Sequence, residues 1–108
     1  MTYAVWYMKP DYFRDGIMGH DFCFQYDRLP NKQDLTKTHI HLTDLEVPKE
    51  KRLDYIFVQM QGEVWSPNGE ARSLIEGKGL SHTSMSVGDI IVGNGETYLV
   101  DRCGFVVL

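Results

Sequence analysis

The stretch from Glu63 to Val92, EVWSPNGEARSLIEGKGLSHTSMSVGDIIV, constrains the fold more than any other part of the chain. It contains the densest run of residues that start, stop or turn regular structure. A Gly-Asp pair directly before the β-branched run 90–92 is typical of a tight turn that enters a buried strand. The stretch therefore predicts a short helix, then an irregular polar segment, then a strand.

Two helices are predicted around the start of this stretch. The main helix, at about 50–64, carries one continuous apolar stripe at helical spacing. The stripe consists of Leu53, Ile56, Phe57, Met60 and Val64. A short helix is predicted at about 68–77, with Ser66 as its N-terminal cap. Trp65 lies between the two helices, and we expect it to cover the end of the main helix and to direct its indole N–H at a partner.

Strands are predicted on both sides of the helices. The apolar or β-branched runs that predict them are Thr2–Met8, Thr38–Thr43, Ile90–Val92, Thr97–Val100 and Phe105–Leu108. The connection 93–95, Gly-Asn-Gly, predicts a hairpin turn with positive φ angles. Segment 21–28 alternates weakly and is interpreted as a short edge strand or as a loop with aromatic anchors. Segment 29–37 is interpreted as an exposed loop.

In chain order, these elements predict one α+β domain that spans residues 1–108. We expect two layers, in which a mixed or antiparallel sheet of about four or five strands carries both helices on one face. The 43% of hydrophobic residues is enough for one modest core. No apolar run approaches the length that spans a bilayer, and residues 3–8 are too short for a signal peptide, so we expect a cytoplasmic protein. Cys23 and Cys103 are expected to be buried free thiols.

The formal net charge of −4 disfavours a general nucleic-acid-binding protein. The one basic cluster consists of Lys49, Lys51 and Arg52. We interpret it as the solvated start of the main helix. Nucleic acid becomes a credible partner only if the fold gathers this cluster with Arg72 and Lys78 into one patch.

The pair His39-x-His41 is the strongest chemical signal in the sequence. Residues two apart on a strand point to the same side, so both imidazoles can reach one metal ion, while Ile40 and Leu42 point to the other side. His82, His20 or a carboxylate could complete a site of three or four ligands, and His82 is the candidate we favour. Zinc is the alternative cofactor, although two histidines alone do not specify it. The alternative is that these histidines are solvated or make ordinary hydrogen bonds.

A binding surface is predicted around the short helix, because Trp and Arg are enriched among the residues that dominate protein interfaces. Its candidate residues are Trp65, Asn68, Arg72, His82 and Ser84. His82 and Ser84 also have the side chains of a general base and a nucleophile. Such a pair requires an orienting acid and an oxyanion site, and the sequence identifies neither. No catalytic residue is predicted.

The C-terminal half resembles the C-terminal signature of small YodL-like proteins and related uncharacterised families of phages, plasmids and integron-type mobile elements. The pattern is a Ser-rich approach, a Ser-Val-Gly-Asp turn, a hydrophobic strand and a terminal Tyr-x-Val-Asp-x-x-Gly-Phe. It falls on Ser84, Ser86, Val87, Gly88, Asp89, Tyr98, Val100, Asp101, Gly104 and Phe105. The resemblance implies an accessory protein of bacterial mobile DNA, and it implies no catalytic residues.

These observations favour a small accessory domain that binds another protein and has no catalytic activity or cofactor. The alternative is a metal-binding protein or a metal-dependent enzyme that uses His39, His41 and His82 to hold zinc. Neither a nucleic acid nor a membrane is an expected partner. A homodimer is left open, in which an exposed terminal strand pairs across a two-fold axis.

Overall fold

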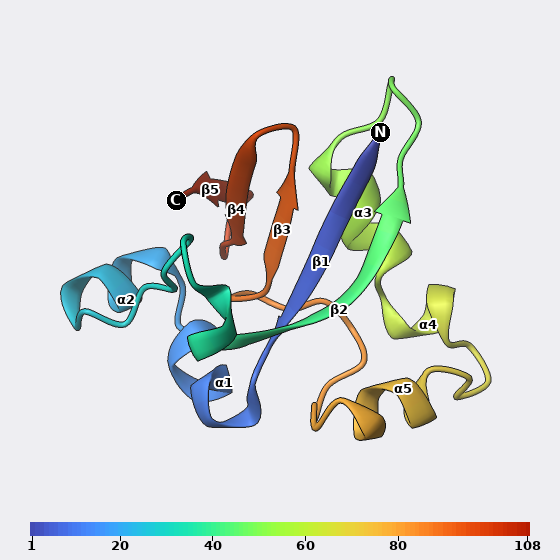
Figure 1. The fold of residues 1–108 in the computed structure, drawn as a ribbon, viewed down its shortest axis with the longest axis horizontal. Helices are drawn as coiled ribbons and strands as arrows, with labels where there is room; N and C mark the ends of the chain where they lie inside the picture. Colours follow the sequence, from blue (N-terminus) through green and yellow to red (C-terminus); the bar gives the residue numbers. More distant parts are fainter.

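The fold is built on one open sheet of five antiparallel strands, seen in a computed structural model that describes residues 1–108. The strands are β1 (Thr2–Met8), β2 (His39–Glu46), β3 (Ile90–Gly93), β4 (Glu96–Val100) and β5 (Phe105–Val107). They lie in the order β2-β1-β3-β4-β5, so β2 and β5 form the two edges (Figure 1). This arrangement confirms the predicted α+β fold.

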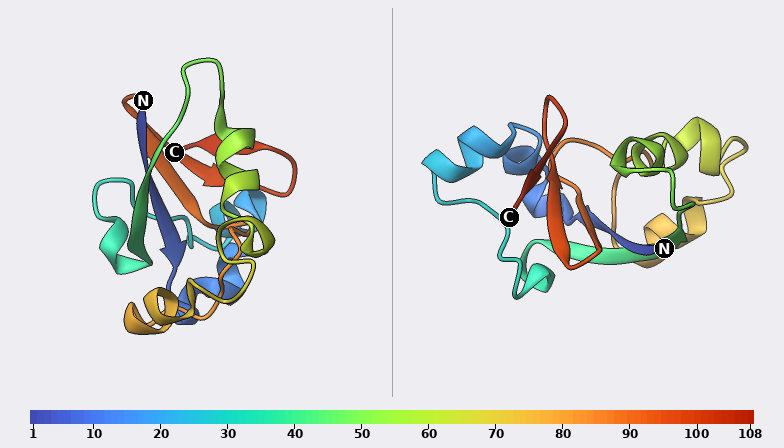
Figure 2. Two further views of the ribbon diagram at one scale, coloured as in Figure 1. Left: turned by 90° about the vertical axis from the view of Figure 1, so that its right-hand side faces the viewer. Right: turned by 90° about the horizontal axis from the view of Figure 1, so that it is seen from above.

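Five helices and one short 3-10 turn complete the chain. They are α1 (Pro10–Gly16), α2 (His20–Gln25), η1 (Leu35–Lys37), α3 (Leu53–Gln59), α4 (Gly62–Trp65) and α5 (Arg72–Gly77). Figure 2 shows α3 standing against one side of the sheet, with α4 and α5 following it. No helix combines the length and the apolar composition needed to cross a membrane.

The main core lies between α3 and one face of the sheet. Tyr3, Val5 and Tyr7 alternate along β1 and point toward α3, where Ile56 and Met60 meet them. All five side chains are buried. Residues two apart on β1 point to one side of the sheet, and the apolar stripe predicted for α3 packs against that side.

The predicted main helix is divided in two. The helical stretch α3 ends at Gln59, and Gln61 has the extended backbone angles φ −76° and ψ 140° before Gly62 starts α4. The short helix also begins later than predicted, because the Ser66 hydroxyl accepts the N–H of Ala71, at 2.8 Å, within a turn that precedes α5. Both differences follow from glycine and polar residues that favour turns over helix continuation.

Segment 21–28 is mostly helical, so the interpretation as an edge strand or a loop is wrong. Phe22 and Tyr26 lie one helical turn apart and their ring centroids are 4.7 Å from each other. Cys23 lies on the inner side of α2 and is buried with Tyr12 of α1. Aromatic residues at every second position, as in Phe22, Phe24 and Tyr26, fit either a strand or a short helix. The packing of Cys23 on α1 favours the helix.

The other face of the sheet is partly covered by segment 29–37, which is less exposed than predicted. Leu35 of η1 is buried against Ile90 and Leu99. Of the two cysteines, Cys23 is buried as expected, whereas Cys103 is exposed, and both are free thiols. Asn94 and Gly95 have positive φ angles of 55° and 77°, which confirms the predicted hairpin turn.

Candidate functional site

The segment from His82 to Asp89 forms a polar joint between β1 and the helices. The Asp89 carboxylate is fully buried and accepts the backbone N–H groups of Met8 and Ser86, both at 2.8 Å. Through the bond from Ser86, Asp89 caps its own turn, and the bond from Met8 ties that turn to the end of β1. Burial raises the pKa of the Asp89 carboxyl, and the neighbouring His82 ring and these two N–H groups oppose the rise.

The His82 ring is a hydrogen-bond partner of the Asp89 carboxylate. Its Nε2 lies 2.9 Å and 3.1 Å from the two carboxylate oxygens, and the tautomer assigned from this contact has the Nε2–H as the donor. The ring stacks on Tyr7 at a centroid distance of 4.5 Å and meets the edge of Phe13 at 4.8 Å. Nδ1 is buried and has no hydrogen-bond partner. This geometry fixes the tautomer and the orientation of the ring.

Two aromatic side chains converge on the carbonyl oxygen of Thr83. The Tyr7 hydroxyl donates to it at 2.7 Å, and the Trp65 indole N–H donates to it at 3.0 Å. Burial, together with the Asp89 charge, raises the pKa of the Tyr7 phenol, so Tyr7 remains a donor. The expected partner for the Trp65 indole is therefore present, and Trp65 acts here in holding α4 to the joint.

Ser84 also holds the joint together. Its hydroxyl oxygen accepts the N–H of Gly62 at 2.7 Å, at the start of α4. Its backbone carbonyl accepts the Ser86 hydroxyl at 3.0 Å. No hydrogen bond joins Ser84 to His82, whose Nε2 is occupied by Asp89. The pair therefore has the contacts of a structural turn rather than those of an activated nucleophile.

The three histidines of the zinc hypothesis lie in different surroundings. His39 is buried, and its two ring nitrogens lie 2.7 Å from the Thr38 hydroxyl and 2.7 Å from the Gly88 carbonyl oxygen. Burial lowers its pKa from 6.5 to about 4. His41 is partly exposed, with Nε2 2.8 Å from the Asp44 carboxylate. His39 and His41 do share one side of β2, as predicted.

Metal binding at these residues would have to compete with existing hydrogen bonds. No group of three or more His, Cys, Asp or Glu side chains is arranged to hold a metal ion. Both nitrogens of His39 already have partners, and a nitrogen that donates to a carbonyl oxygen cannot coordinate metal at the same time. The zinc alternative stays a prediction, which a titration with the metal can test.

The predicted surface residues around the short helix are only partly brought together. Asn68 bonds to Glu70 through both its backbone N–H and its side-chain amide. Arg72 lines a hollow of about 470 Å³ between α4 and α5, together with Glu76 and Thr83. Trp65 does not line this hollow. His82 and Ser84 lie in the joint described above.

Three neighbouring hollows lie beside α3, over aromatic side chains of the sheet. The first, about 530 Å³, is lined by Met1, Tyr3, Pro48, Lys49, Lys51, Arg52 and Asn94. The next, about 260 Å³, shares Tyr3, Arg52 and Asn94 with the first and adds Leu53, Asp54, Tyr98 and Phe105. The last, about 350 Å³, shares Asp54 and Phe105 with the second and is also lined by Phe57, Val58 and Arg102. These three hollows are neighbours that share lining residues, and we call them together the α3–β5 groove.

The floor of the groove is aromatic, and its two ends differ in charge. Tyr3, Tyr98 and Phe105 come from β1, β4 and β5 and point to the same side of the sheet as the main core. Gly93 permits this packing, because a Cβ atom there would collide with the Tyr3 ring. Lys49, Lys51 and Arg52, at one end, make no salt bridge and are exposed. Asp101 and Arg102 lie together at the other end.

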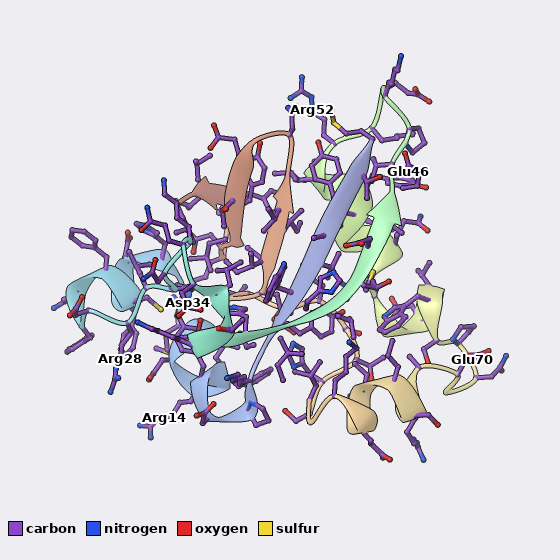
Figure 3. The ribbon with its side chains drawn as sticks, viewed as in Figure 1. Arg14, Arg28, Asp34, Glu46, Arg52 and Glu70 are labelled. Atoms are coloured by element: carbon purple, nitrogen blue, oxygen red, sulfur yellow. The ribbon has the colours of Figure 1, made fainter.

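The basic residues of the chain are therefore not gathered into one patch. Lys49, Lys51 and Arg52 line one end of the α3–β5 groove, whereas Arg72 lines the separate hollow between α4 and α5. Figure 3 shows Arg52 at the end of the molecule opposite to α5. The condition under which a nucleic acid becomes a credible partner is not met by this arrangement.

The α3–β5 groove is not evident as a binding surface from the sequence. The sequence favours interpreting its basic residues as a solvated helix start. One signal was available: Tyr3, Tyr98 and Phe105 each fall at a core-facing position of a strand, yet two of them, Tyr98 and Phe105, are only partly buried. Which strands lie side by side depends on the sheet order, which the sequence does not state.

Comparisons with protein-family models, with curated proteins and with solved structures found no match to this chain. The resemblance of the C-terminal half to YodL-like proteins therefore stays a prediction. The structure gives the signature a physical role that does not depend on the resemblance. Ser84, Ser86 and Asp89 supply the hydrogen bonds of the joint, and Phe105 lines the groove.

Proposed function

We propose that this chain is a non-catalytic domain that binds a protein partner through the α3–β5 groove. The observation that carries the proposal is the groove itself, a row of three neighbouring hollows with an aromatic floor and three unpaired cations at one end. Binding sites on proteins combine a concave, largely apolar surface with a few convergent polar groups. Tyr, Phe and Arg are also among the residues enriched at protein interfaces.

The shape of the groove favours an extended segment of the partner. Tyr98 and Phe105 offer ring faces and edges on which an apolar side chain of that segment can pack. Lys49, Lys51 and Arg52 would then meet carboxylates of the same segment at the end of the groove. Because the domain is acidic overall, this local positive charge would orient an acidic segment on approach.

The biological setting of the proposal rests on the resemblance to YodL-like proteins. It makes the domain an accessory protein of a bacterial mobile element, working in the cytoplasm. Two free cysteines, one of them exposed, are in keeping with a reducing compartment. The joint around Asp89 supports a structural assignment for the polar residues of the signature, because their hydrogen bonds are made within the domain.

The proposal is tested by selecting ligands from a display library of random peptides on the immobilised domain. Peptides that combine acidic residues with an aromatic or aliphatic residue are expected to be enriched. The variant Lys51→Glu/Arg52→Glu should bind these peptides at least about tenfold more weakly, measured by fluorescence anisotropy, because it reverses the charge at the end of the groove.

A matched control separates the groove from a general effect of charge. The variant Arg14→Glu/Lys37→Glu changes the net charge by the same amount at exposed positions outside the groove. Figure 3 shows Arg14 at the end of the molecule opposite to Arg52. The control should keep the wild-type affinity. Failure to enrich any peptide, or an equal loss in both double variants, would overturn the proposal.

A further inference from the structure

The strand β2 presents a long edge that the chain itself does not cover. It has eight residues, His39–Glu46, and its only neighbour in the sheet is β1. No backbone group of these residues hydrogen-bonds to any backbone outside the ladder with β1. Free edges of this length can bind another strand, and proteins usually shorten or cover them.

Two hydrogen bonds at the ends of β2 show which backbone groups point away from β1. The Thr38 carbonyl accepts the N–H of Lys9, and the Val47 N–H donates to the Met1 carbonyl, so both residues face β1. In a regular antiparallel strand every second residue directs its backbone N–H and C=O groups at the neighbouring strand. Residues 38 and 47 are separated by an odd number of positions, so in a regular strand they could not both face β1. The bulge in the pairing, where Val5 lies opposite Thr43 and the next residue opposite position 41, removes this conflict.

The bulge gives the free edge a symmetric pattern. Counting from both ends, residues 39, 41, 44 and 46 direct their N–H and C=O groups away from β1. This set is symmetric about the midpoint between Leu42 and Thr43. Among these outward backbone groups, only the Asp44 carbonyl oxygen has a hydrogen bond within the chain, a long one of 3.3 Å from the Thr43 hydroxyl. This oxygen still has a second lone pair free to accept another hydrogen bond.

We propose that β2 pairs with β2 of a second copy of this chain, antiparallel and about a two-fold axis between Leu42 and Thr43. In this register the backbone N–H and C=O groups of His41 exchange hydrogen bonds with those of Asp44 in the second copy. By symmetry, the same groups of Asp44 bond to His41 of the second copy. The two sheets then form one continuous sheet across the dimer. The axis makes the contact isologous and closed.

The side chains match in the same register. His41 and Asp44 pair with Trp6 and Ala4 of β1, so they lie on one side of the sheet, and each meets the opposite charge type in the second copy. On the other side, Ile40 would face Leu45 of the second copy. Without the bulge these facing residues would lie on opposite sides of the sheet, so the bulge is what makes the edge self-complementary.

The opposite edge of the sheet offers much less. The strand β5 has only three residues, Phe105–Val107, and pairs with β4. The N–H of Leu108, just after β5, is already bonded to the Thr97 carbonyl, so Leu108 faces β4. Because alternate residues face the neighbouring strand, the N–H of Val107 points outward. The geometry therefore favours β2 over the terminal strand as the surface that joins two copies.

The test is sedimentation equilibrium of the full chain over rising concentration. The wild-type protein should show a reversible transition to the mass of two chains. Asp44→Pro removes an N–H that is unpaired within one chain but donates across the proposed axis, so it should shift the transition to higher concentration by at least about tenfold. Val107→Pro removes an outward N–H at the other edge and should leave the transition unchanged.

A second pair of variants keeps the test decisive if Asp44→Pro fails to fold. Asp44→Lys places a cation opposite His41 of the second copy and should weaken the dimer, whereas Glu96→Lys makes the same charge change at an exposed position on β4 and should not. Hydrogen exchange should slow at the amides of Asp44 and Glu46 as concentration rises. A monomer at all concentrations, or a dimer sensitive to Val107→Pro alone, would overturn the proposal.

Discussion

Two buried ionisable side chains, His39 and Asp89, share the end of the sheet where β1 stops. His39 is 1% exposed and donates to the Gly88 carbonyl. Asp89 directly follows Gly88 in the sequence. Burial favours the neutral form of each side chain, so it lowers the pKa of His39 and raises the pKa of Asp89. The two residues therefore make the stability of the fold depend on pH.

Lowering the pH should destabilise the protein through His39. The unfolded chain binds a proton at His39 below about pH 6.5, whereas the folded chain does so only near pH 4, so the free energy of unfolding falls as the pH drops through this window. The difference between the two pKa values corresponds to a loss of about 3 kcal/mol once the pH is below both. Urea titrations at several pH values measure it.

His39→Gln isolates this contribution. Glutamine can still donate to the Gly88 carbonyl from a similar position, but it does not titrate. The slope of the unfolding free energy between pH 4 and 6.5 should be shallower in the variant than in the wild type. Comparing the two slopes removes the opposing contribution of Asp89, and equal slopes would show that His39 is not the group responsible.

Removing the Asp89 carboxylate should be among the most damaging changes in the protein. Asp89→Ala leaves the N–H groups of Met8 and Ser86 and the His82 ring without their acceptor in a buried place, at a cost of about 3–5 kcal/mol. Asp101 accepts the N–H groups of His20 and Arg102 but is partly exposed, so Asp101→Ala should cost about 1.5 kcal/mol. A similar cost for both would contradict this account of the joint.

The joint from His82 to Asp89 is the element that connects the two halves of the fold. It bonds to β1 through Met8 and Tyr7 and to α4 through Gly62. Because these bonds join residues far apart in the sequence, they set how the helices lie on the sheet. Packing and hydrogen bonding within the joint therefore account for the polar residues of the C-terminal signature.

Gly88 should tolerate no side chain within the joint. Its φ is +100°, and a Cβ atom there would lie 2.6 Å from the carbonyl carbon of Gly16. Gly88→Ala is therefore expected to lower the unfolding free energy by about 2–5 kcal/mol through backbone strain and overpacking. Gly79 also has a positive φ, of +72°, but has open space around it, so Gly79→Ala should cost only about 1–2 kcal/mol. Equal costs in thermal or urea unfolding would refute the steric part of this account.

Elements with a clear period are predicted well from this sequence, and their ends are not. The run of aromatic and β-branched residues predicts β1, and the apolar stripe predicts α3, so both elements lie where expected. The division of the main helix at Gln61 depends on bonds from its side chain to the Phe57 and Met85 carbonyls, and the second of these comes from a distant segment. A tertiary contact of this kind leaves no local pattern.

The candidate site is harder to predict, because it is made by strands that are distant in the sequence. The α3–β5 groove joins Tyr3 at the start of the chain to Phe105 at its end, through a sheet order that depends on the placement of β1 between β2 and β3. The hydrogen-bond role of Trp65 could be inferred, since a buried indole needs an acceptor. That His41 and Asp44 share one side of β2 could not, because the bulge changes the period.

Across the whole molecule, the α3–β5 groove and the β2 edge lie on different elements, so they can be tested independently. Variants at Arg52 should change peptide binding without changing the dimer transition, and variants at Asp44 should do the reverse. Exposed apolar side chains also occur elsewhere, among them Phe24 and Tyr26 on and just after α2. A map of the whole surface is therefore needed to identify where a ligand binds.

The most direct test of the central claim is a ¹⁵N–¹H NMR titration of the domain with a peptide selected from the random library. The amides of Tyr3, Arg52, Tyr98 and Phe105 should show the largest shift changes, because these residues line the α3–β5 groove. Largest changes around Arg72 and Trp65, or on α2, would contradict binding in the groove and would place the interaction surface on another face of the domain.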